Sequence, residues 1–248
     1  MKLALECPTN LLGAVQPLAD FDWILAHLVL QDEKYAEYYK RSGRFKVLDN
    51  SVNELLEPIL MEDLVKATNI VLPNLVVAPD FLGDSGKTWE ALHEATYMLG
   101  KARVLPVVQG SSLEEVLDLF GKLLVANFEN IAVPYDILSS RKDSPATMAS
   151  NRVKVVNSII NEAPIGFNIH LLGMTTIEEL TQHNKGWVKS IDTGVPVLLG
   201  SKGYAIERAN IDKSRPTMSQ FGEVSVDTAH LGSIYYNIAY LRKILNSR

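Results

Sequence analysis

The sequence predicts a single (β/α)8 TIM barrel domain spanning residues 1–248. Three observations predict it: the chain has 248 residues, it contains eight short apolar runs suited to strands, and helical segments alternate with these runs from the third onward. Strands buried on both faces read as continuous apolar runs, and their alternation with helices indicates a parallel sheet. A doubly wound open sheet is the alternative fold. We place no domain boundary, because no linker or repeat interrupts the pattern.

The candidate strands are runs rich in aliphatic and aromatic residues, which suit a buried sheet. They cover residues 2–8, 21–30, 44–50, 74–81, 103–110, 130–138, 166–173 and 188–197. The candidate helices carry apolar residues at the helical period. They cover residues 52–68, 87–101, 112–127, 146–162, 176–184 and 232–248. The last of these is amphipathic, and its Tyr residues would also suit a homodimer interface.

Several helix starts carry their own signal. Ser111 or Ser112 precedes "LEEV", and Thr175 or Thr176 precedes "IEEL", so a hydroxyl cap stands ahead of first-turn glutamates. The first two connections fit the pattern poorly, because one is too short for a full helix and the other, residues 31–44, is polar. We therefore expect both to be irregular.

Composition limits the possible functions. The formal net charge is −5, so the whole molecule does not present a nucleic-acid or anionic-membrane surface, although a local basic face remains open. Cys7 is the only cysteine, which excludes an internal disulfide and a cysteine-based zinc site. No His pair has metal-ligand spacing, and we expect no metal and no cofactor. Glu6 interrupts the first apolar run and no run is long enough to span a membrane, so we expect a cytoplasmic protein.

Carboxylates fall where the predicted strands end. In a barrel of this kind the carboxyl ends of the strands and the loops after them form the active site. Asp49, Asp80, Asp136 and Asp192 lie at such ends, together with Gln109. The reading of Asp136 as a turn or helix cap stays open, because a single Asp after a strand often has that role.

Paired carboxylates in one pocket suit two kinds of chemistry. They serve nucleophilic catalysis through a covalent intermediate, or general acid and base catalysis, because burial and mutual repulsion separate their pKa values. Substitution at the anomeric carbon of a sugar uses such a pair.

Two segments carry a more specific pattern. "SIDTGVP" places Pro196 four residues after Asp192, and "VLDNSVNE" places Asp49 directly after an apolar strand. They resemble segments of the tRNA-guanine transglycosylases and of their phage and bacterial relatives that act on DNA. These enzymes are (β/α)8 barrels that exchange guanine in nucleic acid for a 7-deazaguanine base through a covalent aspartyl-sugar intermediate. The resemblance implies that Asp192 is the nucleophile and Asp49 the acid/base, although Asn50, Ser51 and Val52 depart from the family's Asp-Ser-Gly-Gly pattern.

The same resemblance supplies candidates for binding the base. "VVAPDF" and "PVVQG" look like the family's segments that read the guanine edge, and "HLLGMTT" like the segment beside it. "IAVPYDI" echoes a further segment weakly, with a tyrosine suited to stacking. The implied substrate-binding residues are Asp80, Gln109, Gly110, Asn50, Ser51, Tyr135, Leu172, Gly173 and His170. For His170, a core residue and a residue that orients a carboxylate both remain open.

The resemblance has one large gap. Family members that act on tRNA carry a zinc site of three Cys and one His after the last strand, and this chain has no such set. The relatives that act on DNA are therefore the closer comparison, and DNA is a more suitable partner than tRNA. Basic loop residues are the candidates for phosphate contacts. They are Lys87, Arg141, Lys142, Lys202, Arg208, Lys213 and Arg215.

Two other functions remain open. "LLGMTT" and "GSKGY" follow the last two strands, where isomerases and aldolases with this fold bind phosphate. A non-catalytic subunit that helps a partner protein to bind nucleic acid is the third possibility.

Overall fold

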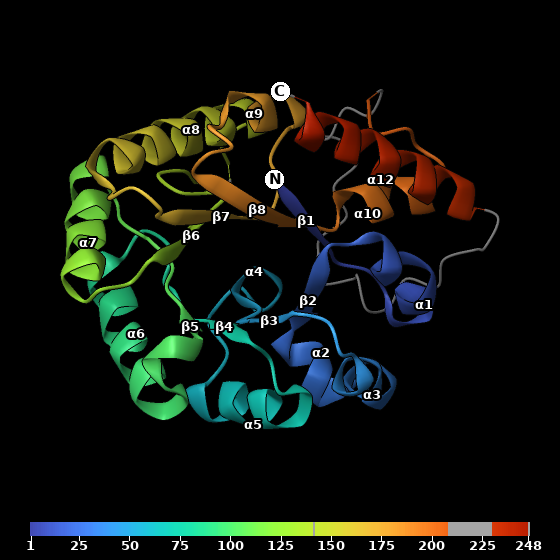
Figure 1. Cartoon of the computed structure of the whole chain (residues 1–248), viewed down its shortest axis with the longest axis horizontal. Helices are drawn as coiled ribbons and strands as arrows, with labels where there is room; N and C mark the ends of the chain where they lie inside the picture. The colour runs from blue at the N-terminus through green and yellow to red at the C-terminus, as the bar shows by residue number, and fades with distance from the viewer. Residues whose placement is uncertain (141, 208–229, 248) are drawn as a thin grey trace.

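A computed structural model of the chain describes residues 1–140, 142–207 and 230–247. Eight parallel strands form a nearly closed barrel, and helices surround it (Figure 1). This is the predicted (β/α)8 fold. The strands are β1 (Lys2–Leu5), β2 (Phe21–Leu25), β3 (Lys46–Asp49), β4 (Leu75–Val77), β5 (Val104–Leu105), β6 (Asn130–Pro134), β7 (Asn168–Leu172) and β8 (Val188–Thr193).

The strand order shows how the ring is built. It runs β5-β4-β3-β2-β1-β8-β7-β6, and every pair is parallel. The strands at the two ends of this order, β5 and β6, come together through a bridge between Val107, which follows β5, and Ala132 of β6. After each strand the chain returns along the outside of the barrel before the next strand begins. The carboxyl ends of all eight strands therefore lie at one end of the barrel.

Helices cover the outside of the barrel, and most follow the predicted periodic segments. The helices are α1 (Leu12–Val15), α2 (Ala26–Gln31), α3 (Glu33–Arg41), α4 (Val52–Leu55), α5 (Met61–Val71), α6 (Ser85–Leu99), α7 (Leu113–Val125), α8 (Pro145–Glu162), α9 (Ile177–Gln182), α10 (Val195–Ser201) and α12 (Leu231–Asn246). Short 3-10 turns occupy Thr9–Leu11, Gln16–Leu18 and Lys101–Arg103. The side chains of Ser112 and Thr176 accept hydrogen bonds from the first turns of α7 and α9, as predicted.

The early connections differ partly from expectation. The first is irregular, as predicted, but the second is helical, so that expectation was wrong. The apolar run 21–30 changes from strand to helix after Leu25. Asp32 then caps α3 by accepting from two backbone N–H groups, and Tyr35 and Tyr39 of α3 are buried. The polar composition of the segment concealed this one-sided apolar pattern.

The predicted helix 52–68 is divided in two. α4 has only four residues, and Leu56 follows it with a left-handed backbone (φ 68°). Pro58 then stands between α4 and α5. The interruption matters for function, because α4 lies inside the ring of the barrel in Figure 1 rather than on its outer surface.

Candidate active site

A cavity of about 920 Å3 opens at the carboxyl ends of the strands. The ends of β1, β3, β6, β7 and β8 line it, together with α4 and the loop that follows β4. Its wall is strongly acidic. The acidic residues that line it are Glu6, Asp49, Glu54, Glu57, Asp80, Glu94, Asp136 and Asp192. The predicted strand-end carboxylates are therefore brought together in one cavity.

Asp192 is held firmly in place at the end of β8, with only 3% of its surface exposed. Its Oδ1 lies 2.9 Å from Nε2 of His170, and the backbone N–H of Gly173 reaches both carboxylate oxygens at 3.1 and 3.2 Å. The other ring nitrogen of His170 lies 2.8 Å from the Ser190 hydroxyl, and the ring stacks on Trp23. With Nε2–H donating, Asp192 accepts hydrogen bonds from two donors, the His170 ring and the Gly173 backbone.

His170 is a buried core residue with hydrogen-bond partners at both ring nitrogens, one of which is the Asp192 carboxylate. It does not line the cavity but supports Asp192 from the barrel interior.

A buried ion pair outside the cavity fixes the position of the Gly173 backbone N–H, which donates to Asp192. Arg152 on α8 donates to the carbonyl oxygens of Leu172 and Gly173, each at 2.9 Å, and pairs with Glu179. Burial acts to raise the pKa of Glu179. The charge of Arg152 and the hydrogen bonds that Glu179 accepts from His183, Arg152 and Thr175 outweigh burial and lower this pKa to about 2. Gly173 has a left-handed backbone (φ 69°), and a side chain there would come within 3.1 Å of the Tyr135 ring. Glycine is therefore required at this position.

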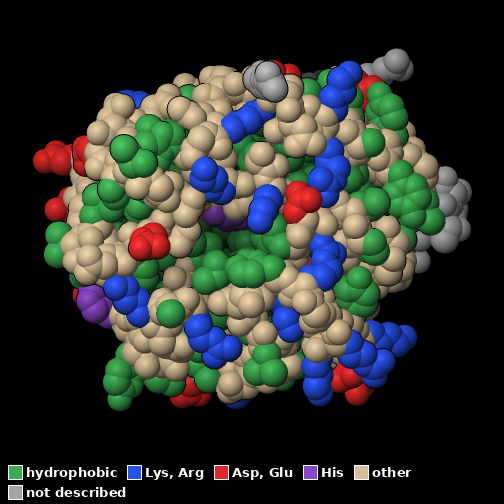
Figure 2. Space-filling view, viewed as in Figure 1, with side chains coloured by type: hydrophobic (Ala, Val, Ile, Leu, Met, Phe, Trp, Pro, Cys, Tyr) green, Lys and Arg blue, Asp and Glu red, His purple; other side chains and the backbone are tan. Residues whose placement is uncertain are grey.

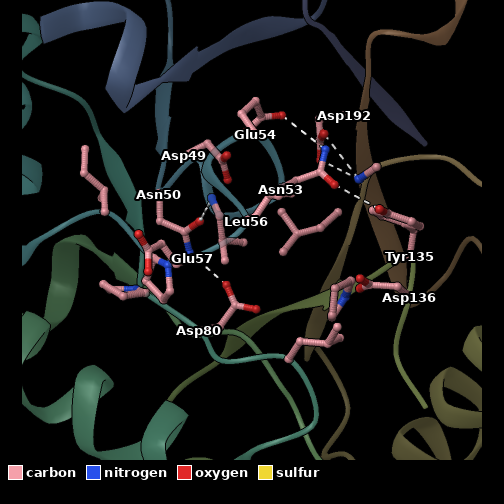
Figure 3. A pocket seen from close by; sticks show the side chains of 18 of the residues that line it. Asp49, Asn50, Asn53, Glu54, Leu56, Glu57, Asp80, Tyr135, Asp136 and Asp192 are labelled. Atoms are coloured by element: carbon pink, nitrogen blue, oxygen red, sulfur yellow. Dashed lines mark hydrogen bonds between the residues drawn. The ribbon is translucent and has the colours of Figure 1, made fainter. Parts of the chain in front are cut away.

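Asp49 and Glu54 approach Asp192 from β3 and α4 (Figure 3). Burial, followed by the charges of Glu54 and Asp192, raises the pKa of Asp49 well above its ordinary value. Burial also raises the pKa of Glu54. Ser51 turns the chain between them with a left-handed backbone (φ 59°), and its N–H donates to Asp49. Both acids thus favour the protonated form beside Asp192.

Glu6, at the end of β1, completes this group and was not among the predicted site residues. Its side chain is 6% exposed and lines the cavity. Burial, and then the charge of Asp192, raises its pKa well above the ordinary value. Glu6 directly follows a buried apolar run, as Asp49 and Asp192 do. The rule that selected those two residues would therefore have found it.

Asp80 has quite different neighbours, and it lies apart from Asp192 in Figure 3. Asn50 donates to one carboxylate oxygen at 2.8 Å and Gln109 to the other at 2.6 Å. Burial raises the pKa of Asp80 to about 6, although these two hydrogen bonds act in the opposite direction. Each oxygen keeps a further lone pair, so the carboxylate can still accept from a ligand.

The remaining predicted binding residues divide into two groups. Tyr135 and Leu172 line the cavity, and the Tyr135 hydroxyl donates to Asn53 at 2.9 Å. Ser51 and Gly110 are buried and do not line it. A side chain on Gly110 would contact Glu115 and Val116 at 3.0 Å, so this glycine permits close packing against α7.

The predicted basic residues are not part of the cavity wall. Lys87 and Lys142 are exposed, and Lys87 pairs with Asp84, which caps α6. Lys202 is also exposed. Arg141, Arg208, Lys213 and Arg215 lie outside the described residues. No Lys or Arg is found among the described residues that line the cavity, so the expected positive potential does not extend into it.

Positive charge is instead visible at the opposite end of the barrel. Figure 2 shows the end at which the strands begin, where Lys and Arg side chains surround a central hollow. Lys2 begins β1 and Lys189 lies near the start of β8, so both belong to this end. The two ends of the barrel thus differ in charge.

Comparisons with known proteins add no assignment. No model of a protein family matches the chain, and a search of curated proteins gives no match. Among the described residues, no group of three or more His, Cys, Asp or Glu side chains is arranged to hold a metal ion. None of the described helices has the length and apolar character needed to cross a membrane.

Proposed function

We propose that the protein is a base-exchange transglycosylase that replaces guanine in nucleic acid, DNA rather than tRNA, with a 7-deazaguanine base. One observation carries the proposal. Asp192 is a buried carboxylate held by two donors, and it faces acids that favour their protonated forms in the same cavity. This arrangement supports the proposal, because substitution at an anomeric carbon requires a nucleophile and a proton donor in one cavity.

In the first half of the reaction a carboxylate oxygen of Asp192 attacks the anomeric carbon of the target nucleotide. The bond from that carbon to N9 of guanine breaks, and its electron pair stays on the departing base. Asp49 gives its proton to the base, because burial and the neighbouring acids raise its pKa and so favour the protonated carboxyl. The products of this step are free guanine and an ester between Asp192 and the sugar.

In the second half the steps reverse with a different base. The 7-deazaguanine passes its N9 proton to the Asp49 carboxylate, and N9 attacks the anomeric carbon. The ester bond to Asp192 breaks, and the Asp192 carboxylate is restored. Proton and charge balance over the cycle, so no cofactor is needed.

Asp80 and Gln109 are suited to hold the base during the exchange. An ionised Asp80 accepts from the ring N–H and the exocyclic amine of guanine, which are adjacent donors. Asn50 and Gln109 hold its two oxygens in place. The target base must leave its stack to reach so deep a cavity.

The acidic wall also bears on the alternative functions. A phosphate-binding isomerase or aldolase needs free backbone N–H groups and positive charge, but the N–H of Gly173 is already donated to Asp192. A negative charge on Asp192, which accepts that N–H, would repel a phosphate. A non-catalytic role as a partner's subunit remains an outcome of the test below.

The test measures covalent chemistry directly. The isolated protein is incubated with labelled guanine or 7-deazaguanine and with DNA or tRNA, then denatured and examined by mass spectrometry. We expect base exchange and a protein–DNA adduct, and no adduct with Asp192→Asn. Asp118→Asn is the matched control, because Asp118 lies exposed on α7, where it pairs with Lys122. An adduct that persists in Asp192→Asn, or competition by inorganic phosphate for base binding, contradicts the proposal. An isolated wild-type chain that binds DNA without exchange supports the subunit role instead.

A further inference from the structure

Glu6 stands directly beside Asp192, and the sheet register fixes this arrangement. Ala4 of β1 is paired with Asp192 of β8, and the N–H of Glu6 donates to the carbonyl oxygen of Thr193 at 3.2 Å. Residues two apart on a strand point to the same side of the sheet. Ala4 and Glu6 therefore face the same side as Asp192, and only the methyl group of Ala4 lies directly across from it.

The hydrogen-bond donors around the two carboxyl groups are unequally shared. Asp192 has two, from His170 and Gly173. Oε2 of Glu6 is buried, and no donor among the described residues reaches it. A buried carboxylate oxygen without a donor is costly, whereas a protonated carboxyl is itself a donor. A proton on Glu6 thus supplies the hydrogen-bonding group that its carboxyl otherwise lacks, whereas Asp192 already has two donors.

The charges around Glu6 act in the same direction. Asp192 faces it from β8, Glu54 from α4 and Asp49 from β3, and each acts, after burial, to raise the pKa of Glu6. Cys7 and Tyr35 also lie within electrostatic range of Glu6. Burial raises the pKa of Cys7 to about 12, so this thiol carries no opposing charge at neutral pH.

We propose that Glu6 is a positioning residue that holds the shared proton of a Glu6–Asp192 pair and donates it as a hydrogen bond to the nucleophile. The inference rests on the proposed function for its catalytic meaning, but the location of the proton does not depend on it. The hydrogen bond aims the Asp192 oxygen that attacks and keeps a second negative charge away from it. The pair carries one negative charge in its reactive state.

The first experiment locates the proton in the absence of substrate. Infrared difference spectra at pH 7 compare wild type with Glu6→Gln, and Glu57→Gln is the control because Glu57 lines the same cavity but is exposed. We expect Glu6→Gln to remove a protonated-carboxyl band and Glu57→Gln to remove none. Loss of only a carboxylate signal in Glu6→Gln overturns the inference and leaves the proposed function standing.

A second measurement covers the case in which Glu6→Gln does not fold. Glu54→Gln protein is labelled with 13C at the glutamate carboxyls and studied by NMR, since its remaining protonated glutamate would be Glu6. We expect one glutamate resonance at the protonated position at pH 7. The absence of such a resonance overturns the inference.

The second experiment tests the positioning role by kinetics. Glu6→Ala removes the donor, and we expect kcat to fall about 100-fold with little change in the KM of the base. Glu6→Gln keeps an N–H donor at the same place and is expected to recover at least tenfold of this loss. Equal losses in the two variants overturn the positioning role. Absence of base exchange in the wild type overturns the proposed function instead, without altering the proton location found by infrared spectroscopy.

Discussion

Asp80 and Asp192 are the same residue type, both are buried, both follow barrel strands and both line the same cavity. Their neighbours separate them. Asp80 is surrounded by amide groups that donate to it, whereas Asp192 has acids on one side and two donors on the other. The comparison shows that position on a strand brings a carboxylate to the site, and neighbouring donors and charges then determine its role.

The group around Asp192 also has a thermodynamic consequence. The pKa values of Glu6, Asp49 and Glu54 are raised in the folded protein. These three acids therefore contribute fully to stability below the pKa values of the unfolded chain, which lie near 4, and this contribution is lost as pH rises through the folded pKa values. The fold therefore maintains this group at some cost at neutral pH. The pair of Arg152 with Glu179 acts in the opposite direction, because the Glu179 pKa is lowered: its stabilisation is full above the unfolded value near 4.5 and is lost as pH falls through about 2.

The largest effect that would separate the two regions is expected from Asp192→Asn. It removes the proposed nucleophile, so kcat should fall on the order of 10^3- to 10^4-fold. It also removes a negative charge from among three acids, so the free energy of unfolding at pH 8 should rise by about 1 kcal/mol. Steady-state base exchange and urea unfolding measure the two effects. A variant that is inactive because it is unfolded would contradict this prediction.

A smaller effect of a different kind is expected from Asp80→Asn. The amide cannot accept from both donors of the base as a carboxylate does, so the KM of the base should rise about 10- to 100-fold, from a loss of roughly 1–3 kcal/mol. The chemistry at Asp192 should be little affected at saturating base. Equilibrium titration with 7-deazaguanine completes the comparison, because Asp192→Asn should still bind the base. If both variants lose base binding equally, the division of roles is wrong.

The difference between the two regions was only partly visible in the sequence. The strand-end rule and the order of the motifs identified Asp49, Asp80 and Asp192, because parallel strands bring their carboxyl ends together. Glu54 could not be found in this way, since it reaches the cavity only because α4 is a single turn next to Leu56, a non-glycine residue with a left-handed backbone. Nor could the sequence show that the Gly173 N–H is donated to Asp192, because that contact depends on Arg152 packing from a different helix.

The smallest effect tests the pH dependence of the Asp80 region. In the proposed function the base binds to an ionised Asp80, whose pKa is about 6, so affinity should be full above pH 7 and fall about tenfold per unit below pH 6. Asn50→Ala removes one donor to the ionised form, which raises the pKa of Asp80 further and moves the midpoint to higher pH. A rise of roughly half a pKa unit lowers the ionised fraction at pH 6 from about one half to about one quarter, so binding at this pH should weaken about twofold. Asn53→Ala is the matched control, because Asn53 lies in the same segment but bonds Tyr135 and Glu54 rather than Asp80. A midpoint that moves equally in both variants would mean that the loop, and not the donated hydrogen bond, controls the ionisation of Asp80.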